Sequence, residues 1–559
     1  MRKNGIVVWL LCVSLTGLSA EGNAKSPDPS GVTYHLDTIT QGDHLTTVRL
    51  RLRFRADKDG KATLRLPDRW GGGDRFYERL KDLDIKGAKT VTTPEPAVRE
   101  INAKPYALIT VSYRLEANRT PGQEVPLDTN YTYPVIAPDW FYITGPGLFA
   151  VVEGRDPQAQ HFSWSLPRGW TGATNLQYPT PPELNEAAEQ SVLLAGKDVH
   201  IAQLKVKSGD LRIAWRGHFD QFTSDAFNAS VHDIINAEQS FWGEGQDHFL
   251  VTLAPSESAK GGRSIRGSGL GESFAMVATP ETELGALKII LAHEYFHSWN
   301  PLRLGGFDPD EEEKSGYWFS EGFTDYYARK LAYEGGAVDA QQFMATWNDA
   351  LRAYAASPYR TAPNSVIVEK FWNDPLVQKL PYQRGSMLAV LLDARWRAQG
   401  KSMDGFIHML RDQARADTAS KAPHVKLIDR LNRAATAYGV DFGDLIDRYM
   451  LKGEAMTLPE DAFGAKFRVV SEDVPVRTLG YDPDKSRAAG AFVAVDPEGP
   501  AYRAGIREGM KRLRVESRGV GDGHDVITAV VEGAEGKPQT ITFTATGKDY
   551  IRTQKLILR

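Results

Sequence analysis

The chain almost lacks cysteine, because the only one among its 559 residues is Cys12. The remainder of the chain can therefore form no disulfide bond. An excess of basic residues is also missing: the formal net charge is −4 and the pI is about 6.3, which gives no electrostatic support to a nucleic-acid partner. Internal repeats and low-complexity linkers are absent as well. Hydrophobic residues make up 42% and charged residues 25%, as in ordinary globular proteins, and the length predicts about three domains.

Long hydrophobic runs are missing too, except for a short one near the start. Arg2 and Lys3 precede an apolar stretch at residues 6–18, which is too short to span a bilayer comfortably. Together with the small residue Ala20, this pattern is typical of a secretory signal peptide rather than of a buried first helix. We predict a signal peptide at residues 1–20 and export to the periplasm or the medium, with no membrane insertion after its removal. Cys12 is an unfavourable lipid-anchor site, because large residues precede it.

The hydrophobic pattern along the chain changes twice. Residues 31–207 are mostly strand-like, and residues 48–55 alternate between apolar side chains and arginines. The arginine row is either a binding stripe or, as we prefer, a solvated sheet face. From about Ser224 to Leu451 the period is helical, with helices expected at 386–397, 404–415 and 426–438, and short strands return from about Ala465. We predict a multidomain α+β fold with an N-terminal β domain at 25–207, a helical domain at 208–460 and a further domain at 461–559.

His293 and His297 are the strongest chemical signal in the sequence. Four residues apart on a helix, they lie on one face, one turn from each other. Thr279-Pro280-Glu281 supplies a predicted N-cap and first turn, and the residues that follow are apolar almost all round, so the helix should be buried. Two histidines and Glu294 are costly to bury unless something satisfies them, and a zinc ion would do so.

A third ligand distinguishes a metal site from a chance pattern. Glu321 lies in an aromatic-rich segment that is expected to form a helix ending at Gly335-Gly336. It can complete a site of two histidines and one glutamate that leaves a fourth position open. Asp325, four residues further on the same helix face, can accept the free N–H of a ligating imidazole and fix its tautomer.

Residues 293–300 (His-Glu-Tyr-Phe-His-Ser-Trp-Asn) and 318–327 (Trp-Phe-Ser-Glu-Gly-Phe-Thr-Asp-Tyr-Tyr) together resemble the glycyl aminopeptidase family of gluzincin zinc metallopeptidases. The resemblance extends to residues 382–388 and 391–393. It implies an N-terminal β-sandwich-like domain, a thermolysin-like catalytic domain and a C-terminal PDZ-like domain, whose helix start is similar to residues 499–506.

The resemblance also implies roles for individual residues. His293, His297 and Glu321 would hold one zinc ion per chain, Glu294 would be the general base, and Asp325 matches the family's outer aspartate. Tyr382 would be the hydrogen-bond donor to the transition state. Its alternative interpretation is an aromatic core residue at a helix start.

The sequence departs from the family in three places. The 23 residues between His297 and Glu321 include an acidic run at 308–313, which either favours basic substrates or is a plain exposed loop. The family's Gly-Gly-Leu-Glu-His segment is replaced by residues 261–273, and the C-terminal domain has no Gly-Leu-Gly-Phe-type carboxylate loop. An aminopeptidase needs an anion to hold the substrate amine. Glu272 is the candidate, next to an expected edge strand at 274–277, although a loop glutamate is usually just solvated.

Three functions follow from these observations. The first is a zinc aminopeptidase for short peptides with N-terminal glycine or alanine. The second is a zinc endopeptidase, or an exopeptidase of another specificity, because the amine-binding segment differs. The third is a non-catalytic peptide-binding scaffold, which the presence of Glu294 and all three candidate ligands makes less favoured.

Overall fold

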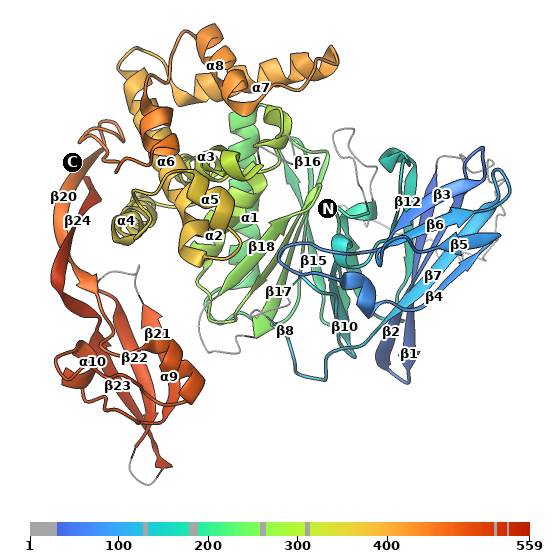
Figure 1. Ribbon diagram of the computed structural model, residues 1–559, viewed down its shortest axis with the longest axis horizontal. Helices are drawn as coiled ribbons and strands as arrows, with labels where there is room; N and C mark the ends of the chain where they lie inside the picture. Colours follow the sequence, from blue (N-terminus) through green and yellow to red (C-terminus); the bar gives the residue numbers. More distant parts are fainter. Residues whose placement is uncertain are drawn as a thin grey trace, which may run out of the picture.

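The computed structural model describes residues 31–126, 132–177, 188–257, 264–307, 313–518, 523–533 and 536–559. The predicted signal peptide, the Gly-Gly-Arg segment at 261–263 and nearly all of the acidic run at 308–313 lie outside these ranges. The described chain forms three parts in sequence order: a β-rich part at one end, a central sheet with a group of helices, and a small unit at the end of a β ribbon (Figure 1). The prediction of a multidomain α+β fold is confirmed.

The N-terminal part consists of three sheets around a hydrophobic core. Their strand orders are β12-β1-β2-β7-β4, β13-β14-β10-β9 and β11-β3-β6-β5. The strands are β1 (Val32–Gln41), β2 (His44–Arg55), β3 (Lys61–Arg65), β4 (Lys81–Lys86), β5 (Thr90–Thr92), β6 (Val98–Asn102), β7 (Leu108–Glu116), β9 (Val135–Ile136), β10 (Trp140–Thr144), β11 (Val151–Val152), β12 (Gln160–Ser165), β13 (Thr171–Thr174) and β14 (Val192–Gly196). Leu50 and Leu52 on β2 are fully buried, whereas Arg49 and Arg53 are exposed, so the predicted alternation is confirmed.

The central sheet has the order β15-β16-β17-β19-β18. Its strands are β15 (His200–Val206), β16 (Gly209–Trp215), β17 (His248–Glu257), β18 (Ile265–Gly269) and β19 (Ser273–Ala278), and β8 (Val125–Pro126) pairs with the end of β17. The predicted edge strand at 274–277 is wrong in its position, because β18 pairs antiparallel along the outer side of β19. The boundary expected between residues 207 and 208 falls inside the β15–β16 hairpin, so this sheet begins upstream of it.

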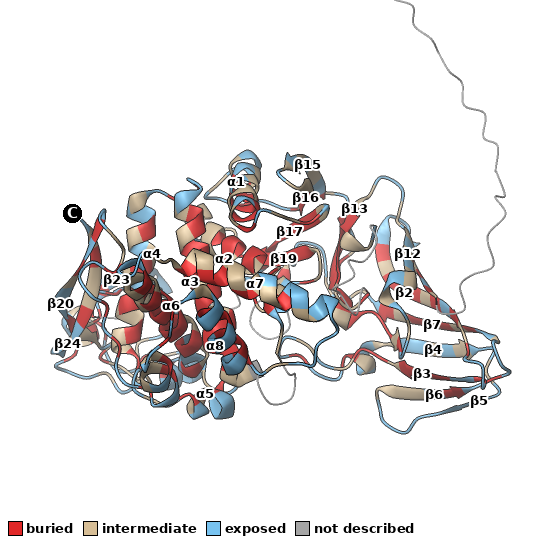
Figure 2. Cartoon of the chain, turned by 90° about the horizontal axis from the view of Figure 1, so that it is seen from above, coloured by how far each residue is buried: buried red, intermediate tan, exposed pale blue. Residues whose placement is uncertain are grey.

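Helices cover the central sheet, and many of their residues are buried in the core that they share with it (Figures 1 and 2). They are α1 (Ser224–Trp242), α2 (Leu284–Phe296), α3 (Glu313–Glu334), α4 (Ala340–Ala356), α5 (Ser365–Lys370), α6 (Pro375–Arg397), α7 (Met403–Ala419) and α8 (Leu427–Tyr438), followed by a π-helical segment at Ile446–Leu451. The predicted end of the second metal-site helix at Gly335-Gly336 is confirmed, as are the two helices α7 and α8 within a few residues.

Two predicted helix starts are wrong. The helix α2 begins at Leu284, not at Thr279, because the Thr279 hydroxyl accepts the Ser264 N–H and contacts the Thr282 hydroxyl instead of capping a helix. The helix α6 begins at Pro375, eleven residues before the expected Ser386, with Asp374 capping the N–H of Leu376. Tyr382 is therefore inside a long helix rather than at its start.

The C-terminal unit is joined to the helices by a two-stranded antiparallel ribbon, β20 (Phe467–Arg477) and β24 (Thr546–Leu558). Asn348 on α4 exchanges two hydrogen bonds with the backbone of Leu556, which holds the base of the ribbon. The far end carries the sheet β21 (Arg512–Arg518), β22 (Val526–Glu532), β23 (Pro538–Thr544) and the short helices α9 (Pro483–Ala489) and α10 (Pro500–Arg503). A separate small core that includes Phe492 and Ile527 shows that this unit packs on itself.

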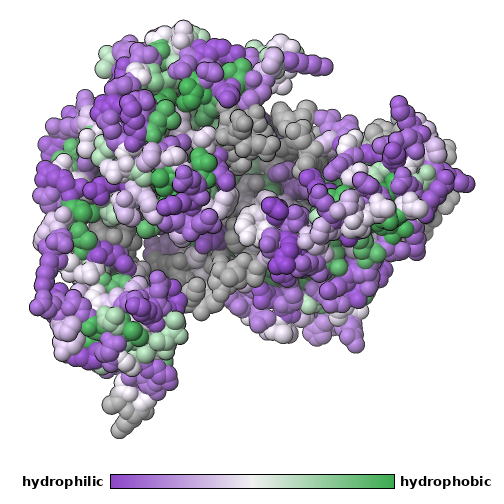
Figure 3. Space-filling model, in the orientation of Figure 1, coloured by the Kyte–Doolittle hydropathy of each residue, from purple (hydrophilic) through white to green (hydrophobic). Residues whose placement is uncertain are grey.

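The surface seen in Figure 3 is predominantly hydrophilic, with hydrophobic residues in small separate patches. Among the residues that the structure describes, no helix combines the length and the apolar character that a membrane span requires.

Two glycines set the approach of α3 to α6. A Cβ at Gly385 would collide with the Trp318 carbonyl oxygen, and a Cβ at Gly322 would collide with the backbone of Gly385. The two helix backbones are therefore in direct contact. Since Gly322 follows Glu321 and Gly385 comes three residues after Tyr382, this contact determines how close the two side chains lie.

We predict that Gly385→Ala lowers the free energy of unfolding by about 1–3 kcal/mol or more, because neither backbone can move aside without displacing packed side chains. Chemical denaturation of the protein measures the change. The matched control is Gly285→Ala on α2, where the added Cβ would meet nothing closer than Gln342 Nε2 at 3.9 Å. The control should be neutral or stabilising by up to about 1 kcal/mol. Equal effects of the two substitutions would contradict the close helix contact.

Candidate metal centre

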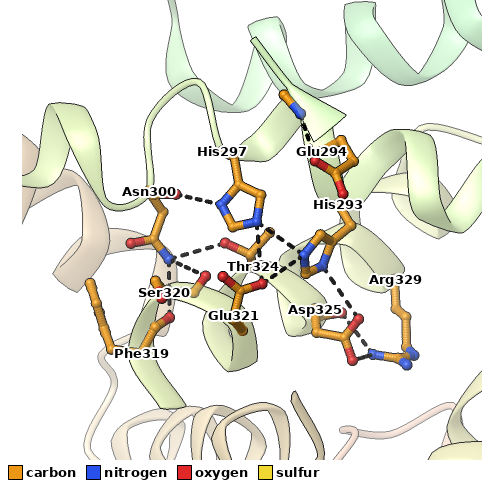
Figure 4. A network of polar contacts seen from close by, with 11 residues as sticks. His293, Glu294, His297, Asn300, Phe319, Ser320, Glu321, Thr324, Asp325 and Arg329 are labelled. Carbon is orange, nitrogen blue, oxygen red and sulfur yellow. Dashed lines mark hydrogen bonds and ion pairs between the residues drawn. The ribbon is translucent and has the colours of Figure 1, made fainter. Parts of the chain in front are cut away.

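The C-terminal end of α2 presents two imidazoles to the same space. His293 is in the last turn of the helix and His297 is its C-cap residue. Their Nε2 atoms are 3.0 Å apart, and both rings point toward α3 (Figure 4). His293 is buried, and half-buried His297 faces the same space, as the four-residue spacing on a helix requires.

The helix α3 brings a carboxylate to the same point. Glu321 Oε2 lies 3.2 Å from His293 Nε2 and 3.4 Å from His297 Nε2. Ligand atoms at about 2.0–2.2 Å from a tetrahedral zinc ion are themselves separated by about 3.3 Å. The three observed separations are close to this value. Among the described residues, this is also the one group of three or more His, Cys, Asp or Glu side chains whose ligand atoms lie together.

The Nδ1 atom of each imidazole, which faces away from the other ligand atoms, lies near a hydrogen-bond acceptor. His297 Nδ1 donates to the backbone carbonyl of Asn300 at 2.7 Å, and His293 Nδ1 lies 3.5 Å from Asp325 Oδ1. In the neutral tautomers that these contacts select, both Nε2 lone pairs point at each other and at the Glu321 carboxylate. Such an arrangement is repulsive unless protons or a cation lie between the three atoms, so the donor set fits a divalent metal ion.

Electrostatics shows how strongly the site attracts positive charge. Burial alone would lower the pKa of His293, but hydrogen bonds to Asp325 and Glu321 raise it to about 10. Burial would raise the pKa of Glu321, yet the two adjacent imidazoles hold it well below its usual range. In the metal-free protein, protons therefore take the place that a metal ion would occupy, and protons and metal compete for the same nitrogens.

Two further residues support the centre and were not identified from the sequence as part of it. Asn300, fully buried, donates from Nδ2 to the carbonyl oxygens of Phe319 and Ser320 and to the Thr324 hydroxyl, which ties the end of α2 to α3. Arg329 donates to Asp325 Oδ2 at 2.5 Å. Burial would raise the pKa of Asp325, but the Arg329 charge and His293 hold it below its usual value. The i,i+4 spacing of Asp325 and Arg329 was the available signal for the second contact.

Comparison with known proteins relates the segment that carries this centre to a family of peptidases. A protein-family model for the M61 glycyl aminopeptidases matches residues 287–367, which include His293, Glu294, His297 and Glu321. The chain is a zinc metallopeptidase. No curated protein sequence gives a significant match to the chain.

One of the matching solved structures shares the fold of the metallopeptidase. An aminopeptidase N family protein from Idiomarina loihiensis superposes with a TM-score of 0.65 at 17% identity, covering 93% of this chain and 97% of that chain. An M1 zinc metallopeptidase from Deinococcus radiodurans gives a TM-score of 0.47 at 15% identity, covering 77% of this chain and 95% of that chain. The first likeness extends over nearly the whole described fold.

Glu294 and Tyr382 both lie beside the metal ligands. Glu294 Oε2 accepts the backbone N–H of Gly269, the last residue of β18, at 3.1 Å. The Tyr382 ring stacks on the His293 ring, with centroids 5.6 Å apart and planes 27° apart. Burial, followed by the charges of Glu321 and Glu294, raises the pKa of Tyr382 well above its usual value. The phenol therefore keeps its proton and can act as a hydrogen-bond donor.

Glu272 is placed differently from the other predicted site residues. It lies in the turn between β18 and β19, and its Oε1 is 3.3 Å from Arg303, which follows the metal-binding helix. Its role as an amine-binding group stays a prediction.

We predict that the metal-free metallopeptidase loses stability between pH 6.5 and about 10. The folded protein binds the His293 proton more tightly than the unfolded chain does, since the pKa rises from 6.5 to about 10. The stabilisation is complete below pH 6.5 and disappears as the pH rises to about 10. Thermal unfolding of chelator-treated protein across this range measures it. The zinc-loaded protein, in which metal replaces the proton, should show a much smaller decline, and parallel curves for the two forms would refute the assignment.

We predict that Asp325→Asn weakens zinc binding by about 10–100-fold, the usual cost of losing a charged outer partner of a ligating histidine. Competition with a chromogenic chelator measures the affinity. Glu334→Gln is a control on the same helix, because Glu334 is exposed and its ion pair is with Lys330, away from the metal ligands in the sequence. If both variants hold zinc equally well, Asp325 has no part in positioning His293.

Proposed function

We propose that the metallopeptidase is an aminopeptidase acting on short peptides with a small N-terminal residue such as glycine or alanine. The observation that carries the proposal is the position of Glu294, beside three convergent ligand atoms and fixed by the Gly269 N–H. The family description of the matching segment supports amino-terminal cleavage. The apolar start of the sequence supports an exported, periplasmic or secreted enzyme.

In this proposal, His293, His297 and Glu321 hold one zinc ion per chain. When bound, zinc supplies a Lewis acid for the scissile carbonyl and lowers the pKa of a water molecule toward about 7. Glu294 takes the proton of the attacking water on a carboxylate oxygen and delivers it to the leaving amine. Tyr382 donates its phenolic proton in a hydrogen bond to the carbonyl oxygen as that atom gains negative charge, a contribution of about 2.7–4 kcal/mol at comparable sites.

The supporting residues preserve this geometry. Asp325 and the Asn300 carbonyl hold the two imidazoles in the tautomers that expose Nε2. The contact between Gly322 and Gly385 keeps α3 against α6, and with them Glu321 and Tyr382. We further propose that residues 461–559 form a PDZ-like unit, on the support of the short helix α10 that begins where the sequence resemblance expects it.

One observation favours a second candidate, an endopeptidase or an exopeptidase of different specificity. Glu272, the expected anchor for the substrate amine, is paired with Arg303, so binding an ammonium group would require it to exchange partners. The non-catalytic scaffold is disfavoured, since a binding protein needs neither Glu294 nor the ligand set beside it.

We predict that the zinc-loaded protein hydrolyses glycyl and alanyl amides, and that Glu294→Gln reduces the rate by a factor of about 10²–10⁴ while zinc content is retained. The control Glu281→Gln changes an exposed residue before the same helix and should leave the rate unaltered. Cleavage restricted to N-acetylated peptides would replace the aminopeptidase with the endopeptidase. A metal-replete protein that cleaves no peptide, with or without Glu294, would favour the scaffold.

A further inference from the structure

A concave pocket lies behind the metal-binding segment, between α7 and the loop that follows α2. Its volume is about 480 Å³, within the usual size range of small-ligand sites. Trp299 and Leu302 from that loop form one wall, and Ala414, Thr418 and Ala419 at the end of α7 form another. None of the residues assigned to the metal centre lines it.

Apolar surface and positive charge are combined in this pocket. Leu302 remains 46% exposed although it is a large hydrophobic residue, so the wall presents uncovered apolar surface. Arg303 and Arg415 both line the same space. Arg303 donates to the Ser298 carbonyl and to Glu272, and Arg415 donates to Glu244. Arg415 has no other protein partner among the described residues and is half exposed, which leaves most of its guanidinium N–H groups available.

The acidic side chain on the pocket lining already has hydrogen-bond partners within the protein. Glu244 is the one acidic residue on the described lining, and it accepts the Trp299 indole N–H at 2.9 Å as well as the Arg415 guanidinium. A ligand in the pocket therefore meets guanidinium donors and an apolar wall but no uncommitted carboxylate. This chemistry favours a ligand with a carboxylate and an apolar group, and disfavours one with a free ammonium group.

We propose that this pocket is a second binding site, which takes the C-terminal carboxylate and apolar last side chain of a peptide. The carboxylate pairs with Arg415, Arg303 adds a second guanidinium to the lining, and the side chain packs on Leu302 and the edge of Trp299. A free apolar amino acid shares the carboxylate and the side chain but adds an ammonium group for which the pocket offers no partner, so it binds more weakly.

The pocket is joined to the metal centre by two short paths. Trp299 lies two residues after His297 and directly before Asn300, whose carbonyl accepts the His297 N–H. Arg303 pairs with Glu272, in the turn that begins at Gly269, and the Gly269 N–H donates to Glu294. A peptide end bound here contacts the segments that fix both a metal ligand and the proposed base.

The test compares N-acetyl-L-leucine with N-acetyl-L-leucinamide by isothermal titration calorimetry on the zinc-loaded protein. The acid should bind, and the amide, which lacks the carboxylate charge, should bind at least about tenfold more weakly. Arg415→Gln should weaken binding of the acid about tenfold, and Leu302→Ser should weaken both compounds. Free L-leucine should bind more weakly than its acetylated form, and tighter binding of L-leucine would overturn the assignment to a peptide end.

Arg433→Gln provides the matched control, because Arg433 is a similarly exposed arginine paired with Asp417 on the neighbouring surface. It should leave the affinity for N-acetyl-L-leucine unchanged. If N-acetyl-L-leucine instead binds at the zinc centre, Arg415→Gln should not change its affinity. Equal affinities of the Arg415→Gln variant and the parent protein for N-acetyl-L-leucine therefore overturn the proposal. Equal affinities for the acid and the amide, or no binding of either at millimolar concentration, overturn it as well. Unchanged thermal unfolding of Arg415→Gln confirms that the variant is folded.

Discussion

The convergence of two imidazole nitrogens and one carboxylate oxygen inside the helical part is the constraint on which the metallopeptidase fold depends. His293 Nε2, His297 Nε2 and Glu321 Oε2 lie within 3.0–3.4 Å of one another, away from most solvent. Burying such groups together is costly unless a cation compensates them. The protein therefore needs rigid elements that hold them in place against their mutual repulsion. It uses the last turn of α2, the middle of α3 and a network of hydrogen bonds between them.

That network explains why so many buried polar groups occur in one place. The Asn300 Nδ2 group donates to two carbonyl oxygens and one hydroxyl of α3, so Asn300 joins the end of α2 to α3 by hydrogen bonds rather than by apolar packing alone. Asp325 holds His293 and is itself held by Arg329. Each outer partner is tied to a helix, which limits how far either imidazole can rotate. The direct contact of Gly322 with Gly385 then adds α6, and with it Tyr382, to the same rigid assembly.

The sequence predicted the parts of this site that depend on local spacing. The pair His293 and His297 and the pair Glu321 and Asp325 were recognisable because helix geometry places residues four apart on one face. Features that depend on contacts between residues far apart in the sequence were missed or assigned to the wrong residues. Thr279 is a residue type that often caps helices, but here its hydroxyl accepts a hydrogen bond from the backbone N–H of Ser264. The edge strand was assigned to the apolar residues of β19, whereas glycine-rich β18 holds the edge through backbone pairing that composition does not reveal. Asn300 acts partly through its carbonyl oxygen, which every residue type possesses.

The β18–β19 turn also explains why the chemistry is easier to assign than the specificity. Gly269 at its start donates to Glu294, and Glu272 near its end pairs with Arg303. One short turn thus connects the proposed base with the proposed amine-binding group. The Gly269 N–H is a backbone group and its contact tolerates sequence change, but Glu272 acts through its side chain and through a partner from another segment. A change in this turn can therefore leave Glu294 in position while altering what the enzyme binds, which is consistent with a departure from the family pattern in this region and an intact set of metal ligands.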